Sequence, residues 1–271
     1  MIPGLPRQWI AAKKAEMNTA TLDSKQIFSK VPEITLVFWL IKIAATTLGE
    51  TGGDTVSMSM NLGYLVGTAI FAALFIVAVL IQIFAKKFHP VIYWTTIVAT
   101  TTVGTTLADY ADRSLGIGYT GGATLLLGLL LASLVAWYRN TGSIAVDTVS
   151  TPKTEIFYWV TIMFSQTLGT ALGDWMADTA GLGYVGGAGI FAALLALVAL
   201  LHFKTRLSPP VLFWAAFILT RPLGAVLGDF LDKPLSHGGL AISRYTASLV
   251  LLALMALLIR IFPQKPAQQG H

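Results

Sequence analysis

The 271-residue chain contains 55% hydrophobic and only 11% charged residues, and its mean hydropathy is +0.72. This composition excludes an ordinary soluble domain. The formal net charge of +5 comes from basic residues in short connecting segments, which is the pattern of an orientation signal, so we expect no nucleic-acid partner. The chain has no cysteine, which excludes disulfides and thiolate metal sites. The expected partner is a lipid bilayer.

Residues 1–30 carry five basic side chains and lack the continuous apolar core of a secretion signal, so we expect a cytoplasmic tail or an interfacial helix there. Residues 31–262 follow as the membrane domain, and residues 263–271 as a second cytoplasmic tail. Three uncharged apolar stretches each exceed the roughly 20 residues that span a ~30 Å hydrocarbon core. They cover residues 62–85, 117–138 and 179–203. Because they are long and do not alternate, we predict an all-α polytopic protein with eight transmembrane helices.

Four tandem copies of one two-helix unit make up the membrane domain, at residues 31–86, 87–140, 152–206 and 207–262. Each unit has a tryptophan, a glycine ten residues later and an aspartate fifteen residues later. In chain order these are Trp39, Trp94, Trp159 and Trp214; Gly49, Gly104, Gly169 and Gly224; and Asp54, Asp109, Asp174 and Asp229. The tryptophan spacings of 55, 65 and 55 residues indicate two pairs of units.

The second helix of the first three units begins with Gly-Tyr-x-x-Gly, starting at Gly63, Gly118 and Gly183. The fourth unit departs from this pattern with His237-Gly238-Gly239. Two helices per unit give all units the same orientation, so we expect parallel repeats and a pseudo-symmetric bundle. Positions within a unit are counted from its tryptophan, so the four glycines lie at plus ten and the four aspartates at plus fifteen. The plus-ten glycines of the first helices are expected to allow close packing between helices.

Basic residues concentrate in the segments that join one unit to the next. They are Lys86, Lys87, Arg139, Lys153, Lys204 and Arg206. By the positive-inside rule, we expect a protein of the cytoplasmic (inner) membrane with both termini cytoplasmic. The tryptophans are then expected to anchor the cytoplasmic interface. The aspartates, roughly 22 Å further along at ~1.5 Å per residue, are expected to lie deep or near the opposite mouth.

The first helices carry nearly all the intramembrane ionisable residues, which predicts that they form the inner helices. A charged side chain facing lipid costs at least ~2.5 kcal/mol, so we expect the acids to converge on an interior cavity. Alternatively, the repeated aspartates are helix caps or loop acids beyond the membrane. The candidate metal ligands are Glu50, Asp54, Asp109, Asp112, Asp174, Asp178, Asp229 and Asp232.

Two basic residues also fall within the first helices, Lys42 in the first unit and Arg221 in the fourth. The simpler interpretation is that they neutralise buried acids. The sharper one is a movable counter-charge, in which Lys42 or Arg221 occupies the carboxylates when no cation is bound.

Carboxylates and threonine hydroxyls without cysteine suit hard cations such as Mn²⁺, Mg²⁺ or Ca²⁺. Organic cations are a competitor, because an aromatic residue follows the aspartate in three units and could form a cation–π cage. These residues are Tyr110, Trp175 and Phe230. The chain shows no GxSxG, HExxH, P-loop or dinucleotide-binding motif, so we do not expect an enzyme.

These repeats resemble a bacterial family of membrane-anchored proteins built from four tandem repeats of unknown function. The sequence motifs that carry the resemblance most strongly are Tyr93-Trp94, Tyr158-Trp159 and Phe213-Trp214, with Leu107-Ala108-Asp109, Leu172-Gly173-Asp174 and Leu227-Gly228-Asp229. The resemblance covers residues 31–262 and implies a fold of four two-helix repeats without assigning an activity.

From these features we expect a transporter that moves a hard divalent cation, with a manganese-like ion favoured and proton exchange as an option, through a site built from the four repeated aspartates. The cation is the substrate, and no cofactor is expected. The alternatives are a transporter of small organic cations, a cation channel, a membrane scaffold without transport activity, or an intramembrane enzyme. The sequence leaves homo-oligomerisation open.

Overall fold

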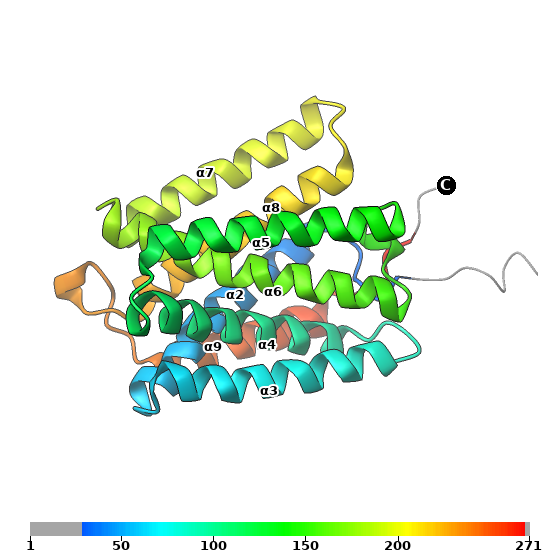
Figure 1. Ribbon diagram of the computed structural model, residues 1–271. Helices are drawn as coiled ribbons and strands as arrows, with labels where there is room; N and C mark the ends of the chain where they lie inside the picture. The colour runs from blue at the N-terminus through cyan, green and yellow to red at the C-terminus, as the bar shows by residue number, and fades with distance from the viewer. Residues whose placement is uncertain (1–28, 269–271) are drawn as a thin grey trace, which may run out of the picture.

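The computed structural model describes residues 29–268, in which eight long helices form four consecutive pairs and no β-strand is present (Figure 1). The helices are α2 (Leu36–Asp54), α3 (Gly63–Phe84), α4 (Pro90–Asp109), α5 (Gly118–Thr141), α6 (Pro152–Asp174), α7 (Gly183–Lys204), α8 (Pro209–Asp232) and α9 (Arg244–Ile261). The predicted all-α fold is confirmed. The tail or interfacial helix expected at residues 1–30 falls outside the described residues except for its last two, and so does the end of the C-terminal tail at 269–271.

The inner helices begin where the sequence supplies helix-starting residues. Pro90, Pro152 and Pro209 each occupy the first position of α4, α6 and α8, where a missing N–H costs nothing. Thr35 caps α2 by accepting a hydrogen bond from the Phe38 N–H, and Thr151 caps α6 in the same way. These starts align all four inner helices at one end of the bundle.

Helices α2, α4, α6 and α8 form a closed inner ring, because each packs against the next and α8 packs back on α2. The second helices lie outside this ring. The main packing partner of each outer helix is the inner helix of the following unit: α3 packs on α4, α5 on α6, and α7 on α8. Helix α9 packs on α2 and closes the circle. The expected division into inner first helices and outer second helices is therefore confirmed.

The plus-ten glycines lie at the contacts between inner helices. Each faces the plus-seven residue of the next inner helix: Gly49 meets Thr101, Gly104 meets Gln166, Gly169 meets Arg221, and Gly224 meets Thr46. A Cβ atom at any of these glycines would crowd its neighbour. The same contact recurs four times around the ring, which confirms that these glycines allow the helix backbones to approach closely.

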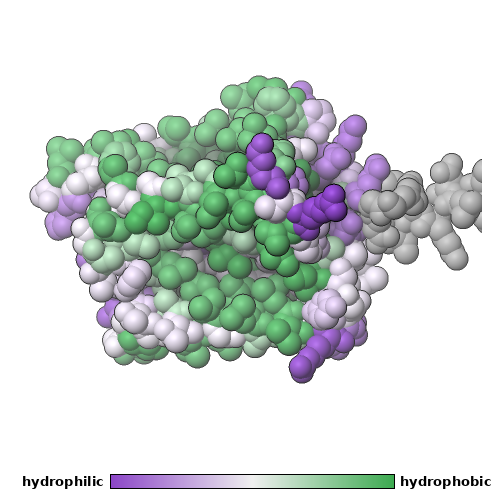
Figure 2. Space-filling model, turned by 90° about the horizontal axis from the view of Figure 1, so that it is seen from above, coloured by the Kyte–Doolittle hydropathy of each residue, from purple (hydrophilic) through white to green (hydrophobic). Residues whose placement is uncertain are grey.

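The outer surface is suited to lipid. Helices α3, α5, α7, α8 and α9 are each long and apolar enough to cross a membrane. The outer helices expose many large apolar side chains, and Figure 2 shows apolar residues covering the flank of the molecule with hydrophilic residues gathered towards its ends. Helices α2, α4 and α6 are less apolar because threonines, glycines and acids replace aliphatic residues on surfaces that face the interior. The chain is a multi-pass membrane protein.

Three of the motif tryptophans are buried inside the bundle. Trp94, Trp159 and Trp214 are only 1%, 2% and 3% exposed, and they pack in one aromatic layer with Tyr93 and Tyr158, whose hydroxyl oxygens are 2.6 Å apart. The expectation that these tryptophans anchor the membrane interface was wrong, because they belong to inner helices whose neighbours cover them. The layer closes the bundle interior at the end where the inner helices begin.

The opposite end carries a distinctive backbone feature. Immediately after the repeated aspartate, α2, α4 and α6 continue into single π-helical turns, η1 (Thr55–Ser59), η2 (Tyr110–Ser114) and η4 (Trp175–Thr179). The outer helices then start at glycines with left-handed backbones, φ +75° at Gly63, +73° at Gly118 and +63° at Gly183, a conformation that only glycine adopts without strain. Helix α8 has no π-helical turn and ends at Asp232, followed by the short 3₁₀ turn η5 (Leu235–His237).

Candidate functional site

The four repeated aspartates lie at the C-terminal ends of the α-helical parts of the inner helices, and all of them are buried. Asp54, Asp109, Asp174 and Asp229 are between 1% and 4% exposed. Buried carboxylates need charged or hydrogen-bonding partners. The structure supplies these partners from basic residues placed just beyond the aspartates.

One half of the site is organised by Arg113, which lies in the π-helical turn η2. Its Nε is 2.9 Å from Asp109 Oδ1, and its Nη2 is 3.2 Å from Asp174 Oδ2. The guanidinium therefore bridges the repeated aspartates of units two and three. Its side chain is 31% exposed, so this bridge lies at the edge of the buried region.

The other half is organised by Lys233, the residue that caps the C-terminus of α8. Its Nζ is 2.6 Å from Asp54 Oδ2, 2.9 Å from Asp229 Oδ1 and 3.8 Å from Asp232 Oδ1. Arg244 adds a second cation, with its Nε 2.8 Å from Asp232 Oδ2 and 3.6 Å from Asp54 Oδ2. Lys233 and Arg113 occupy the same plus-nineteen position of units four and two. The two halves therefore repeat the two-plus-two pattern of the units.

Arg221 lies in the centre of the inner ring, one level below the aspartates. Its Nη2 donates to Glu50 Oε2 at 2.9 Å, to Thr105 Oγ1 at 2.6 Å and to Thr170 Oγ1. Glu50, Thr105 and Thr170 are the plus-eleven residues of α2, α4 and α6, so one guanidinium from α8 reaches all three other inner helices. The expectation that Arg221 neutralises a buried acid is confirmed.

Lys42 has no such role. Its ammonium is fully buried, but it contacts Thr220 Oγ1 at 3.3 Å and lies 4.0 Å from the centre of the Phe217 ring. No carboxylate of residues 29–268 lies within 4 Å of it. The expectation that Lys42 pairs with the acids was wrong, because it lies eight residues, or about two helical turns, before Glu50 on the same helix.

Two of the eight candidate ligands also lie apart from the network. Asp178 is exposed, and Asp112 packs against Gly122 at the start of its own outer helix without an ion pair to any described residue. The structure brings together the remaining six, namely Glu50, Asp54, Asp109, Asp174, Asp229 and Asp232. The repeated plus-fifteen position correctly predicted the four central aspartates. The acids at later positions vary between units, and only some of them join the network.

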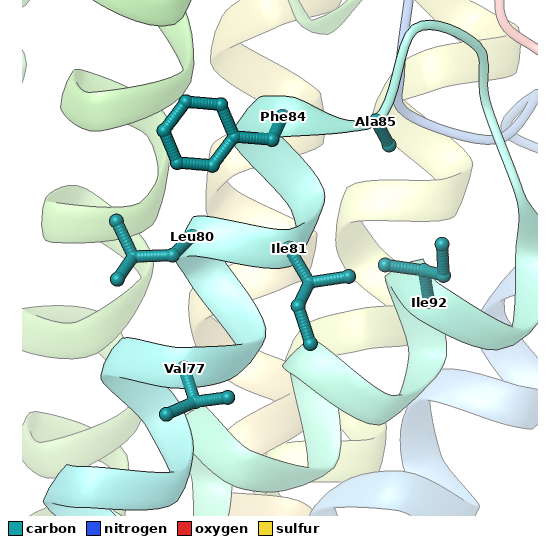
Figure 3. Close-up of a pocket in the computed structure, with 6 residues that line it drawn as sticks. All are labelled: Val77, Leu80, Ile81, Phe84, Ala85 and Ile92. Carbon is teal, nitrogen blue, oxygen red and sulfur yellow. The ribbon is translucent and has the colours of Figure 1, made fainter.

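The acids converge on one another, as the sequence predicted, and on basic side chains that pair with them. Two pockets of the described chain are apolar, and neither has a carboxylate in its lining. Figure 3 shows one of them, between the end of α3 and the start of α4.

Two groups of three carboxylates nevertheless offer oxygen atoms within 4.8 Å of one another, Glu50 with Asp54 and Asp109, and Asp54 with Asp229 and Asp232. Asp54 belongs to both groups. Its Oδ1 atom is buried and accepts no hydrogen bond from any described residue. Oxygen-only ligand sets of this kind suit hard divalent cations.

A family model described as Repeat of Unknown Function (DUF347) matches residues 37–88, 92–143, 157–208 and 212–263. The chain belongs to this family. Each match of the DUF347 repeat falls on one pair of inner and outer helices, which confirms the resemblance to a family with four tandem repeats. Neither a comparison with curated proteins nor one with solved structures found a match.

Sequence reasoning missed three basic members of the network. Arg113, Lys233 and Arg244 were not among the predicted site residues, yet each one pairs with buried aspartates. A usable signal was present for two of them. Arg113 and Lys233 each lie four residues after a repeated aspartate, which is the spacing at which opposite charges meet along a helix. Within the DUF347 repeat, the site is therefore longer than the motif that ends at the aspartate.

Proposed function

We propose that this protein is a transporter of the cytoplasmic membrane that moves a hard divalent cation, with a manganese-like ion favoured, through the carboxylates at the ends of the inner helices. The observation that carries the proposal is a charge imbalance. Six carboxylates pair with four basic side chains, namely Arg113, Arg221, Lys233 and Arg244, so the ionised network holds two more negative than positive charges.

Uncompensated charge is costly in a buried site, because water no longer solvates it. One divalent cation supplies two positive charges, and so do two protons bound to carboxylates. The network is therefore suited to exchanging one divalent cation for two protons. The oxygen ligands around Asp54 provide the hard donor atoms that such a cation prefers.

The two ends of the helix bundle differ in a way that supports one orientation of the protein in the membrane. The loops that join one unit to the next and the C-terminal end of the described chain lie together at one end of the bundle, and the acids lie at the other (Figure 1). Of the ten basic residues of 29–268 that lie outside the site, six are in or next to these joining loops, namely Lys86, Lys87, Arg139, Lys153, Lys204 and Arg206. We therefore place the joining loops and both termini on the cytoplasmic side and the acidic end on the extracytoplasmic side.

A carrier fits the interior better than an open channel. Arg221 crosses the centre of the inner ring below the aspartates, and the buried aromatic layer closes the ring further along. A cation that enters from the acidic end therefore meets two barriers. Passage requires Arg221 and the aromatic side chains to rearrange, which is a property of alternating access.

The test is Mn²⁺ flux into liposomes that contain the purified protein. Asp54→Asn should abolish the flux, because Asp54 belongs to both carboxylate groups. Asp178→Asn is the matched control, because it removes an acid from the same end of the molecule that is exposed and outside the network, and it should keep wild-type flux. Mn²⁺ flux that persists in D54N, or that is absent from the folded wild-type protein, would overturn the proposal.

A further inference from the structure

The backbone conformation at Lys233 differs from that at Arg113, the equivalent residue in the other half of the site. Arg113 lies within a π-helical turn, whereas Lys233 follows α8 with an extended backbone, φ −72° and ψ 154°. The chain then loops out and returns. The N–H of Ala241 donates to the Lys233 carbonyl at 2.9 Å, and Gly239 packs so closely on the backbone of Lys233 that a Cβ would overlap it.

This loop explains why the fourth unit departs from the Gly-Tyr-x-x-Gly pattern. The Leu240 N–H donates to the Phe230 carbonyl at 2.7 Å, and the Ile242 N–H donates to the Leu231 carbonyl at 2.9 Å. These bonds fix the last turn of α8 and thereby the backbone of Lys233. The side chain beyond it remains a flexible four-carbon stem, and it is 13% exposed.

The Lys233 ammonium also occupies a particular place. It contacts Asp54, Asp229 and Asp232, and these are the three residues of one of the two groups whose oxygens lie close enough together to hold a metal ion. Asp54 contributes a second oxygen, Oδ1, that is buried and without a hydrogen bond from the described chain. An ammonium and a metal ion could not share this space.

We propose that Lys233 is a built-in substitute for the transported cation, which must displace the Lys233 ammonium to bind between Asp54, Asp229 and Asp232. The inference rests on the proposed function and adds to it the position of the binding site and a side chain of the protein that competes with the cation for that site. With Lys233 withdrawn, three carboxylates face one remaining cation, Arg244. The local charge is then two negative, which one divalent cation neutralises.

The other half of the network stays closed. The planar guanidinium of Arg113 contacts two carboxylates through two different nitrogens, a more rigid contact than a single ammonium makes. One divalent cation is therefore bound by each chain. The asymmetry between lysine and arginine at the same repeat position selects which half binds the ion.

The experiment measures Mn²⁺ binding by titration calorimetry on the full-length protein in detergent. Lys233→Gln should tighten binding, by roughly tenfold if Lys233 fills the site in nine of ten molecules, because affinity falls with the fraction of protein that is competent to bind. Lys42→Gln is the control, since it removes another buried ammonium that contacts none of these acids, and it should keep the wild-type affinity. Lys233→Arg should weaken binding.

The outcomes separate this inference from the proposed function. If wild-type protein transports Mn²⁺ but K233Q binds it no more tightly, the substitute role of Lys233 is overturned and transport stands. If K233Q gains affinity while wild-type protein shows no flux, the site stands and transport is overturned. Mn²⁺ binding by none of the proteins overturns both. Should K233Q not fold, an unchanged affinity in K233R overturns the role of Lys233.

Discussion

Arg221 and Glu50 form a fully enclosed ion pair in the centre of the inner ring, with 2.9 Å between Nη2 and Oε2. Both residues are exceptions within the repeat. The residues equivalent to Glu50 are Thr105, Thr170 and Ala225, and those equivalent to Arg221 are Thr46, Thr101 and Gln166. The pair therefore joins the first and last units at the point where the ring closes.

We predict that Glu50→Thr, which introduces the residue found in the second and third units, lowers the free energy of unfolding by about 3–5 kcal/mol, because it leaves the Arg221 charge buried without its carboxylate. Adding Arg221→Gln, the residue of the third unit, should recover much of that loss. Chemical unfolding in mixed micelles measures both. A double variant no more stable than E50T would contradict this account of the pair.

The bridge made by Arg113 gives a second prediction. Asp109→Asn and Asp174→Asn should each abolish Mn²⁺ flux in liposomes while the protein stays folded, because each removes one of the two excess negative charges by which the network is suited to a divalent cation. Helical content by circular dichroism and elution as a single species would show that folding is intact. Unchanged flux in both variants would exclude these aspartates from the transport pathway.

The charge imbalance of the network predicts the stoichiometry of exchange. One divalent cation should move against two protons, so the cycle should carry no net charge. Setting a membrane potential with valinomycin and a potassium gradient should then leave the initial rate of Mn²⁺ flux unchanged, while a lumenal pH dye reports proton movement in the opposite direction. A rate that rises steadily with the membrane potential would contradict electroneutral exchange.

Gly224 provides a test of helix packing. A Cβ at this position would overlap Thr46, so Gly224→Ala should destabilise the protein by about 1–3 kcal/mol, the usual cost of overpacking. Gly128 is the matched control, because it lies within α5 and a methyl group added there would meet no atom of the described chain within 4 Å. Thermal melting in detergent should show a lower midpoint for G224A and a midpoint close to wild type for G128A.

Lys30 gives a prediction at the opposite end of the molecule. Its ammonium lies 2.7 Å from Glu155 and donates to the carbonyls of Gln82 and Ile83 at the end of α3. Lys30→Met should destabilise the protein more than Lys30→Met combined with Glu155→Gln, because the single variant leaves Glu155 buried and without a counter-ion. The comparison of their melting midpoints measures the difference.

Much of the fold could be predicted because hydropathy and repeat spacing report directly on burial. The unequal distribution of charge between first and second helices identified the inner ring, since ionisable groups avoid lipid. The packing of each outer helix on the inner helix of the following unit could not be predicted. All first helices share one motif, so the sequence does not distinguish a helix of the same unit from that of the next.

The site was predicted in part for a related reason. The spacing of the aspartates showed that Asp54 and its equivalents share one level of the bundle, but not how the chain continues beyond them. The π-helical turn after Asp109 returns Arg113 to the buried acids, and the loop after Asp232 does the same for Lys233. These backbone features depend on tertiary packing, so the four-residue spacing could indicate the pairs of Arg113 with Asp109 and of Lys233 with Asp229, but not their contacts with Asp174 and Asp54.

The closure of α9 onto α2 has a consequence for how the chain can be connected. Residues 29–33 pair with residues 265–267, with the Ala267 N–H 2.8 Å from the Val31 carbonyl, so the two ends of the described chain lie side by side. The exposed loop at residues 205–208 joins the third and fourth units. A circular permutant that starts at Leu207 and joins residue 268 to residue 29 through a short linker should therefore fold into the same bundle, with its fourth unit synthesised first.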